Sequence, residues 1–351
     1  MLYNKNGDLM KKVIIGMSGG VDSSVAAYLL KKDGYEVIGV TLLLCDSGKE
    51  DTLVAKNVCD KLGIRHIVAE RKELFKTAVI MDFIRAYENG ETPNPCVICN
   101  AEVKIEEMLK IANELGADYV ATGHYSSIVV KDGKHLIKRP ADLSKDQTYM
   151  LYRLTEKQLS RVLMPLSDYT KEQVREIAKE LDLSSADRPD SQDICFIPDG
   201  NYKGFIENFT GKKYPEGDFV LTDGKVVGKH KGIIGYTVGQ RKGLGIALGK
   251  PAFVVSKNKD KNEVVLSDNE ELLFTTTVNL HSVNIIGINS DDLIIPVTAK
   301  LRYRHKDSPA ILTLKGNTAT LEFKEPQRAA ASGQSAVFYQ DDILIGGGII
   351  K

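Results

Sequence analysis

The chain has 351 residues, 42% of them hydrophobic and 27% charged, and its formal net charge is zero. This composition is typical of a soluble globular protein with two or three domains, and no apolar run is long enough for a membrane span. Five cysteines, an odd and low number without the spacing of a disulfide framework, indicate a reducing, cytoplasmic setting.

Up to residue 204, strand-like and helix-like patterns alternate along the chain. Short apolar runs predict strands at 13–17, 36–44, 66–70 and 118–123. Amphipathic patterns predict helices at 21–32, 53–64, 72–89, 101–115 and 170–183. This alternation predicts an α/β domain over residues 1–204, with a parallel sheet covered by helices. Ligands of such sheets bind at the carboxyl ends of the strands.

From residue 205 onward, strand-like runs meet at short glycine turns. FVLTDGKVVGK (219–229) and ILTLKGNTATLEF (311–323) both predict β-hairpins. We place a small central domain at 205–271 and a C-terminal β barrel at 272–351. Residues 225–261 hold nine lysines and arginines against one acid, Asp260. Such a basic segment is typical of a surface that binds a phosphate-rich partner, although a solvated lysine-rich surface is the alternative.

The first predicted strand runs into SGGVDS (18–23) and then into a helix. Small residues let backbone N–H groups approach an anion, and a helix N-terminus adds a favourable dipole. The segment therefore predicts a phosphate-binding loop, although it is neither a Walker A motif nor G-x-G-x-x-G. Residues 16–20 also match G-x-S-x-G, so a serine hydrolase is an alternative.

A C-x-x-C pair, Cys96 and Cys99, lies in TPNPCVICN (92–100). Such a pair can bind a metal, act as a redox couple, supply a catalytic thiol or have no chemical role. We expect Cys99 to lie just before a helix that starts near 101, where the helix dipole would favour a thiolate. Cys59 and Cys45 are expected to be packed, structural thiols.

SGGVDS in this position resembles the PP-loop of the ATP pyrophosphatase superfamily. Across the whole chain, several further segments resemble the bacterial tRNA-specific 2-thiouridylase family: TPNPCVICN, ATGHY (121–125), KDQTYML (145–151), DSQDICFI (190–197), TVGQRKGLGI (237–246), RYRHKDSPA (302–310) and GQSAVFY (333–339). The resemblance implies an enzyme that converts uridine 34 of tRNA to 2-thiouridine. ATP with Mg²⁺ would activate the C2 oxygen as an adenylate, and a persulfide would deliver sulfur.

The resemblance also implies roles for individual residues. Cys99 matches the nucleophilic cysteine and Cys195 the persulfide carrier, while Asp22 would help to hold Mg²⁺. The implied ATP-binding residues are Gly16, Met17, Ser18, Gly19, Gly20, Val21, Asp22, Ser23, Leu42 and Gly123. The implied target-base contacts are Asn94, Pro95 and Cys96, and the implied tRNA contacts are His124, Lys145, Asp146, Gln147, Arg302, Tyr303 and Gln334.

Position 96 departs from the family pattern, which has an aspartate three residues before the nucleophilic cysteine. A cysteine is a poor proton shuttle, so we expect different chemistry here. One hypothesis is a [4Fe–4S] cluster on Cys96, Cys99 and Cys195, since soft thiolates suit such a cluster. The alternatives are persulfide chemistry with a Cys99–Cys195 disulfide between turnovers, a zinc site with His124 as fourth ligand, and a Cys96 that only fills space.

Two other classes of protein remain open: an AMP-forming PP-loop ligase with an amine acceptor, and a non-catalytic tRNA-binding module. The expected partners are tRNA and an upstream sulfur donor such as a cysteine desulfurase. We expect a cytoplasmic monomer that does not contact a membrane.

Overall fold

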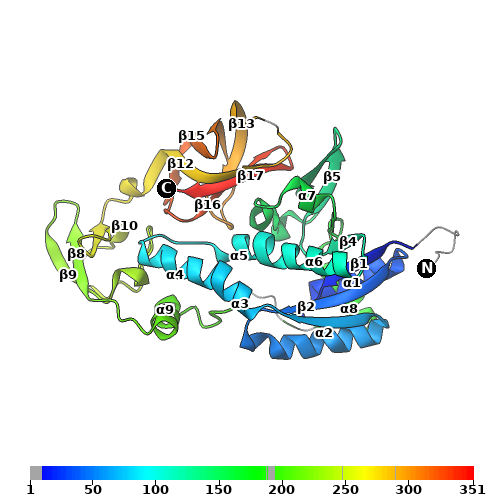
Figure 1. Ribbon diagram of the computed structural model, residues 1–351. Coiled ribbons are helices and arrows are strands. Elements are labelled where there is room, and N and C mark those ends of the chain that lie inside the picture. Colours follow the sequence, from blue (N-terminus) through cyan, green and yellow to red (C-terminus); the bar gives the residue numbers. More distant parts are fainter. Residues whose placement is uncertain (1–9, 187, 189–193, 247, 289) are drawn as a thin grey trace.

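The computed structural model describes residues 10–186, 188, 194–246, 248–288 and 290–351. Three sheets organise this part of the chain: an N-terminal parallel sheet, a small central sheet and a C-terminal barrel (Figure 1). The expected α/β domain, small central domain and β barrel are therefore confirmed. The exact boundaries near 205 and 272 stay predictions. Within the described ranges, no helix combines the length and apolarity that a membrane span requires.

The N-terminal sheet has the strand order β3-β2-β1-β4-β7, and every pairing is parallel. Its strands are β1 (Lys12–Gly16), β2 (Glu36–Leu43), β3 (Arg65–Glu70), β4 (Tyr119–Ala121) and β7 (Val162–Leu163). The chain moves outward from β1 in one direction to β3 and then returns to add β4 on the other side. In folds of this kind, ligands bind at the carboxyl edge of the sheet where the strand order reverses, which here is next to β1.

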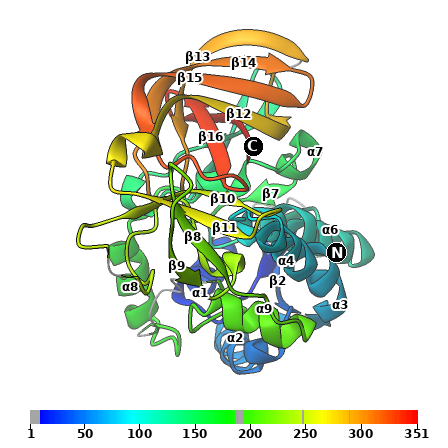
Figure 2. The same cartoon turned by 90° about the vertical axis from the view of Figure 1, so that its left-hand side faces the viewer.

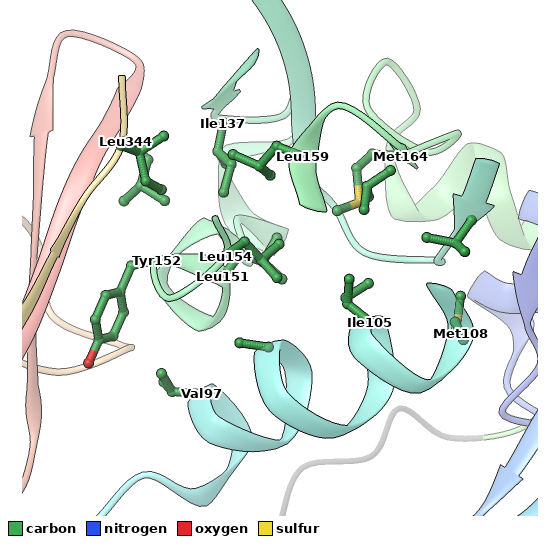
Figure 3. Close-up of a cluster of buried hydrophobic side chains, with 14 of the residues drawn as sticks. Val97, Ile105, Met108, Ile137, Leu151, Tyr152, Leu154, Leu159, Met164 and Leu344 are labelled. Atoms are coloured by element: carbon green, nitrogen blue, oxygen red, sulfur yellow. The ribbon is translucent and has the colours of Figure 1, made fainter. Parts of the chain in front are cut away.

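Helices cover both faces of this sheet, as the alternation of side chains along β1 requires. Val13 and Ile15 pack with α1 (Val21–Lys32), α2 (Lys49–Leu62) and α8 (Lys171–Glu180). Ile14 faces the opposite side, toward a core that α6 (Glu106–Glu114) shares with the barrel. Figure 3 shows part of this second core, in which Val97, Ile105 and Met108 lie along one side and Leu344 of the barrel lies at the end opposite to Met108.

Two long helical stretches each contain a π-helical turn. The first consists of α3 (Lys72–Phe75), η2 (Lys76–Ile80) and α4 (Met81–Glu88), which confirms the helix expected at 72–89. The second consists of α5 (Pro95–Ile98), η3 (Cys99–Ile105) and α6, and it starts six residues earlier than the 101 that we expected. It starts early because the Asn94 side chain accepts a hydrogen bond from the Cys96 N–H and Pro95 occupies the first helical position.

The connections between these elements carry shorter pieces of structure. Their bounds are η1 (Asp46–Gly48), η4 (Leu143–Lys145), η5 (Thr148–Leu151), α7 (Glu156–Leu159), α9 (Tyr202–Thr210), η6 (Ile233–Gly235) and η7 (Glu270–Leu273). The central sheet has the order β10-β11-β8-β9, with β8 (Gly217–Leu221), β9 (Val226–His230), β10 (Phe253–Asn258) and β11 (Glu263–Ser267). The predicted hairpin at Asp223-Gly224 is the β8–β9 pair.

The barrel is built from β12 (Phe274–Ile285), β13 (Asp292–Lys300), β14 (Ser308–Lys315), β15 (Thr318–Arg328), β16 (Ser335–Gln340) and β17 (Ile343–Ile350). Pairing of β12 with both β15 and β17 closes it. The hairpin of β5 (Ser127–Lys131) and β6 (Lys134–Lys138) extends the barrel sheet by pairing with β17, although it precedes the barrel by more than a hundred residues. Figure 2 shows the barrel above the N-terminal sheet, with β8 and β9 in front.

Candidate active site

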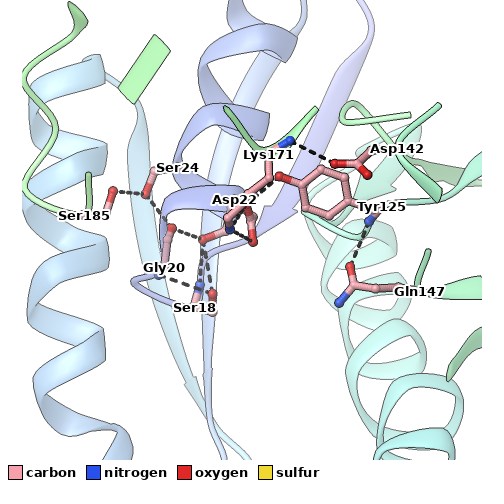
Figure 4. Close-up of polar contacts among 10 residues, drawn as sticks. Ser18, Gly20, Asp22, Ser24, Tyr125, Asp142, Gln147, Lys171 and Ser185 are labelled. Carbon is pink, nitrogen blue, oxygen red and sulfur yellow. Dashed lines mark hydrogen bonds and ion pairs between the residues drawn. The ribbon is translucent and has the colours of Figure 1, made fainter. Parts of the chain in front are cut away.

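The SGGVDS segment forms a tight loop between β1 and α1. The Ser18 and Ser23 hydroxyl oxygens lie 3.2 Å apart, and the Ser23 hydroxyl donates to the Gly20 carbonyl oxygen at 3.0 Å (Figure 4). Gly19 has a φ of 75°, and a Cβ there would lie 2.6 Å from the Asp51 carbonyl oxygen. The loop therefore requires glycine at position 19, and it leads directly into the N-terminus of α1, as a phosphate-binding loop would.

Gly123, at the carboxyl end of β4, lies directly against this loop. A Cβ at position 123 would lie 2.7 Å from the Ser23 nitrogen and 2.8 Å from the Asp22 carbonyl carbon. The structure thus brings together the loop and Gly123, as expected, with Leu42 near the end of the neighbouring β2. The side chains of Met17 and Val21 are buried in the core, so only their backbones could approach a ligand.

Asp22, in the first turn of α1, has close partners within the protein. Its two carboxylate oxygens accept from the Lys171 ammonium at 2.7 and 2.9 Å, and the Tyr125 hydroxyl donates to one of them at 2.9 Å (Figure 4). Within the described part of the chain, no group of three His, Cys, Asp or Glu side chains is arranged to hold a metal ion. The predicted role of Asp22 in holding the Mg²⁺ that accompanies ATP, which one carboxylate and the phosphates could share, stays a prediction.

Sequence reasoning did not identify Lys171, although one signal for it was present. It is the first residue of a predicted helix, directly after the N-cap Thr170, where a cation faces the positive end of the helix dipole.

The Ser18 hydroxyl lies within hydrogen-bond distance of Ser23 and of the Gly20 N–H. A serine nucleophile needs a base, usually histidine, within hydrogen-bond distance. Among the described residues, the hydrogen bonds of Ser18 are to Ser23 and Gly20 and none is to a histidine, so the geometry does not favour the G-x-S-x-G hydrolase alternative.

Cys96 and Cys99 both lie inside the helix that starts at Pro95. Cys96 is half-buried, whereas Cys99 is only 5% exposed. The expectation that Cys99 precedes a helix is wrong, because capping by Asn94 moves the helix start upstream of both cysteines. Burial raises the pKa of the Cys96 and Cys99 thiols, so the resting site does not favour a thiolate.

Lys104 is the cation that opposes this effect, and sequence reasoning did not identify it. Its positive charge lowers the pKa of Cys96, Cys99 and Cys195, although burial outweighs it in each case. Burial also lowers the pKa of Lys104 itself, but its interactions with Cys99, Cys96 and Cys195 more than offset this, and the net shift is upward. Lys104 is therefore the charged centre of the thiol cluster.

The π-helical turn explains why Lys104 can interact with the thiols. In an α-helix, residues five apart point about 140° away from each other. The i→i+5 hydrogen bonding of a π-helix widens the turn and brings such residues closer to one face. Because η3 spans Cys99–Ile105, it contains both Cys99 and Lys104.

Cys195 lies on a turn beside the same cluster. Its neighbour Phe196 packs against the rings of Phe75, Phe83 and Phe205, with centroids 5.5, 5.3 and 5.2 Å away. Cys195 as a residue is exposed, yet burial of its thiol by the surrounding protein raises the pKa of that thiol to about 12. Cys99, Cys45 and Cys96 also contribute to this increase, which places all four thiols within electrostatic reach. Residues 190–193 of the DSQDICFI segment lie outside the described residues.

The zinc and iron–sulfur hypotheses require three or more ligands around one point. No such group is found among the described residues. The His124 Nδ1 atom lies 2.8 Å from the Thr122 hydroxyl, and burial, assisted by Lys104, lowers the pKa of His124 to about 3. His124 is therefore neutral at physiological pH. Cys59 is fully buried and would contact a Cβ at Gly39, which confirms that it is a packed thiol.

Residues from two of the motifs, KDQTYML (145–151) and GQSAVFY (333–339), hydrogen-bond to the cysteine-containing segment 92–100. Asn100 donates through Nδ2 to the Met150 carbonyl oxygen at 3.3 Å. At the start of the segment, the Thr92 N–H donates to the Ser332 carbonyl oxygen at 2.8 Å, and Gln334 Nε2 donates to the Thr92 carbonyl oxygen at 2.7 Å. These contacts attach the start of segment 92–100 to the C-terminal domain.

Several residues expected to contact tRNA have partners inside the protein. Asp146 is buried and accepts from Arg139 at 2.9 Å. Arg302 donates to the carbonyl oxygens of Val238 and Ala329 at 3.2 and 3.0 Å. Gln147 accepts through Oε1 from the Tyr125 N–H at 2.9 Å. These contacts stabilise the protein itself, and the expected role of these residues in tRNA binding stays a prediction.

Lys145 and Tyr303 are half-buried, and the Tyr303 ring lies 5.9 Å from that of Tyr149. Within the basic segment 225–261, Lys229 and Lys250 pair with acids, and Lys257 and Lys259 donate to oxygens of Tyr236 and Asn89. Part of the basic segment thus stabilises the protein itself, which reduces the charge left for a phosphate-rich partner.

Three family models match the chain in sequence. They are described as a tRNA methyl transferase HUP domain (residues 11–199), a tRNA methyl transferase PRC-barrel domain (203–268) and an aminomethyltransferase beta-barrel domain (275–350).

Curated relatives match over nearly the full length. The tRNA-specific 2-thiouridylase MnmA of Lachnoclostridium phytofermentans is 48% identical over 97% of this chain and 99% of its own. The tRNA-specific 2-thiouridylase MnmA 1 of Clostridium tetani is 49% identical over 98% of this chain and 97% of its own. Among solved structures, the NMN synthetase of Francisella tularensis matches with a TM-score of 0.35 and 18% identity over 59% of this chain and 79% of its own. That likeness is too weak to carry an argument.

Proposed function

The chain belongs to the tRNA-specific 2-thiouridylase family, and from this premise we propose that it replaces the C2 oxygen of uridine 34 in tRNA with sulfur, using ATP. The observation that carries the proposal is the link between the phosphate-binding loop and the thiol cluster. The Tyr125 hydroxyl hydrogen-bonds to Asp22, and the Tyr125 N–H hydrogen-bonds to Gln147. Three residues after Gln147, the Met150 carbonyl oxygen accepts a hydrogen bond from Asn100, the neighbour of Cys99. One short segment thus ties together the two halves of the chemistry.

The first step is activation of the C2 carbonyl by ATP. The C2 oxygen attacks the α-phosphorus and forms a new O–P bond, while the bond to the β-phosphate oxygen breaks and pyrophosphate leaves with the electron pair. The loop N–H groups and the α1 N-terminus stabilise the negative charge on the phosphates. Magnesium accompanies ATP as its usual counter-ion.

The second step is sulfur transfer. A persulfide on Cys195 attacks C2 through its terminal sulfur, and AMP leaves. The Cys99 thiolate then attacks the Cys195 sulfur, which breaks the S–S bond and leaves sulfur on C2 as the thiocarbonyl. This route forms a Cys99–Cys195 disulfide, so a dithiol reductant must supply two electrons before the next turnover.

An iron–sulfur cluster on Cys96, Cys99 and Cys195 is the competing route for sulfur delivery. The described arrangement does not support it, so we derive no step through a cluster. Anaerobic purification with iron, followed by absorbance near 400 nm and iron analysis, separates the routes. The persulfide route predicts full activity of a cluster-free Cys96→Asp variant, whereas a cluster route predicts that activity follows iron content.

The proposal implies two macromolecular partners, tRNA and an upstream persulfide donor such as a cysteine desulfurase. It also implies a cytoplasmic enzyme, which we expect to act as a monomer.

An AMP-forming ligase with an amine acceptor is the alternative within the superfamily, and it gives the thiols no role. Mass spectrometry of tRNA nucleosides from cells that lack the protein separates the two. The proposal predicts loss of 2-thiouridine at position 34, and unchanged 2-thiouridine would reject it.

A further inference from the structure

Lys171 is a buried cation beside the phosphate-binding loop. Its side chain is 6% exposed, and its ammonium lies 2.7 Å from one Asp22 carboxylate oxygen and 2.9 Å from the other. Figure 4 shows it reaching from α8 across to the first turn of α1, beside the Tyr125 ring.

The position of Lys171 in its helix is electrostatically unfavourable. It is the first residue of α8, and a positive charge at a helix N-terminus opposes the helix dipole. Burial adds a desolvation cost that only good pairing offsets. Helix formation alone therefore gives no reason for a lysine at this position, which points to a role in the site that the lysine faces.

Asp22 alone would hinder phosphate binding. Its carboxylate is 33% exposed and lies in the first turn of the helix whose N-terminus completes the loop. An unpaired carboxylate there would repel the triphosphate of ATP. Lys171 offsets this repulsion, because its ammonium pairs with Asp22, which lies two residues after Gly20 of the loop.

We propose that Lys171 is a phosphate-binding residue of the ATP site, held on Asp22 in the ligand-free protein and transferred to the pyrophosphate oxygens when nucleotide binds. It donates hydrogen bonds to the oxygens that gain charge as the bond between the α-phosphorus and the β-phosphate oxygen breaks, and it keeps its own proton throughout. This inference rests on the proposed use of ATP and names one more residue of that site.

Removing only the ammonium would leave the Asp22 carboxylate without its counter-ion beside the loop, so the test compares two variants that both lack the ion pair. These are Asp22→Asn and the double variant Asp22→Asn with Lys171→Met. Methionine keeps the apolar length of the lysine stem without its charge. Lys179→Met, an exposed lysine on the same helix, is the matched control. Equilibrium binding of pyrophosphate and of ATP is measured by calorimetry on the full chain.

We expect the double variant to bind pyrophosphate at least tenfold more weakly than Asp22→Asn, and Lys179→Met to match the unchanged protein. Equal binding by Asp22→Asn and the double variant would overturn the inference, because Lys171 would then only neutralise Asp22. If the unchanged protein bound neither ATP nor pyrophosphate, the proposed use of ATP would fail as well, which distinguishes the two failures.

Discussion

At the residue scale, the thiols of this site are held in their neutral form. Burial raises the pKa of Cys96 and Cys99, and the charge of Lys104 offsets only part of that effect. A persulfide chemistry that needs a Cys99 thiolate therefore has to activate it, either by reordering the site when tRNA binds or by drawing Lys104 closer.

The thiol titration gives a first prediction. Because the pKa of Cys99 lies above the ordinary value of 9.0, its alkylation rate should still be rising as the pH passes that value. Lys104→Met should slow alkylation at every pH below the plateau, since it removes the charge that favours the thiolate. Peptide mass spectrometry after timed iodoacetamide treatment measures both rates. Lys110→Met, on the next turns of the same helix, is the control, and equal rates for the Lys104 variant and the unchanged protein would contradict the account.

The close approach of Gly123 to the loop gives a second prediction. In Gly123→Ala the added Cβ would lie 2.7 Å from the Ser23 nitrogen, so the loop has to shift. We expect ATP binding to weaken at least tenfold while the protein stays folded. Gly235→Ala is the control, since its Cβ would meet only the Lys203 side chain, at 3.8 Å. Unaltered ATP affinity in Gly123→Ala would show that the loop does not bind the nucleotide.

At the scale of elements, the π-helical turn η3 orients the thiols relative to Lys104. Inserting one alanine directly after Glu102, an exposed residue inside this turn, would place Lys104 six residues after Cys99 and turn it away from the Cys99 thiol. We expect a folded protein that forms no 2-thiouridine. Glu102→Ala, which removes only the ion pair with Arg153, should remain active. Circular dichroism measures folding and a thiolation assay measures activity, and full activity of the insertion variant would refute this role for the π turn.

Much of the N-terminal domain was predictable because its strands and helices have clear periodicity. The β5–β6 hairpin was missed even though Asp132 and Gly133, with φ values of 52° and 74°, form a D-G turn between short strands. The strand that pairs with this hairpin, β17, lies far away in sequence, so no local pattern could predict that the hairpin joins the barrel sheet. The early helix start at Pro95 had a readable signal, an asparagine N-cap before a proline. A π-helical turn has no comparable sequence signature.

At the scale of the whole molecule, the barrel and the N-terminal domain meet around Asp146. Its carboxylate pairs with Arg139 at 2.9 Å and lies 3.5 Å from Lys300 of the barrel. Arg139 also reaches Asp307 at 3.0 Å. The family resemblance implies that Asp146 contacts tRNA, yet its carboxylate is buried in this ion-pair network.

The variant Asp146→Asn separates a role of Asp146 in stability from a direct contact with tRNA. Loss of a carboxylate from a buried ion-pair network typically costs about 3 kcal/mol or more in the free energy of unfolding. We therefore expect a clear fall in thermal stability, measured by calorimetry. We expect tRNA affinity to fall only slightly, through the weaker contact between the barrel and the N-terminal domain. Normal stability combined with greatly weakened tRNA binding would instead support a direct contact.

The central claim is ATP-dependent thiolation through Cys99 and Cys195, and reconstitution tests it most directly. Unmodified tRNA transcript is incubated with the protein, ATP, a persulfide donor and a dithiol reductant, and nucleosides and AMP are quantified by mass spectrometry. The account predicts one 2-thiouridine at position 34 for each AMP released, and none with Cys99→Ser or without ATP. Formation of AMP without 2-thiouridine, or thiolation by Cys99→Ser at the rate of the unchanged protein, would contradict it.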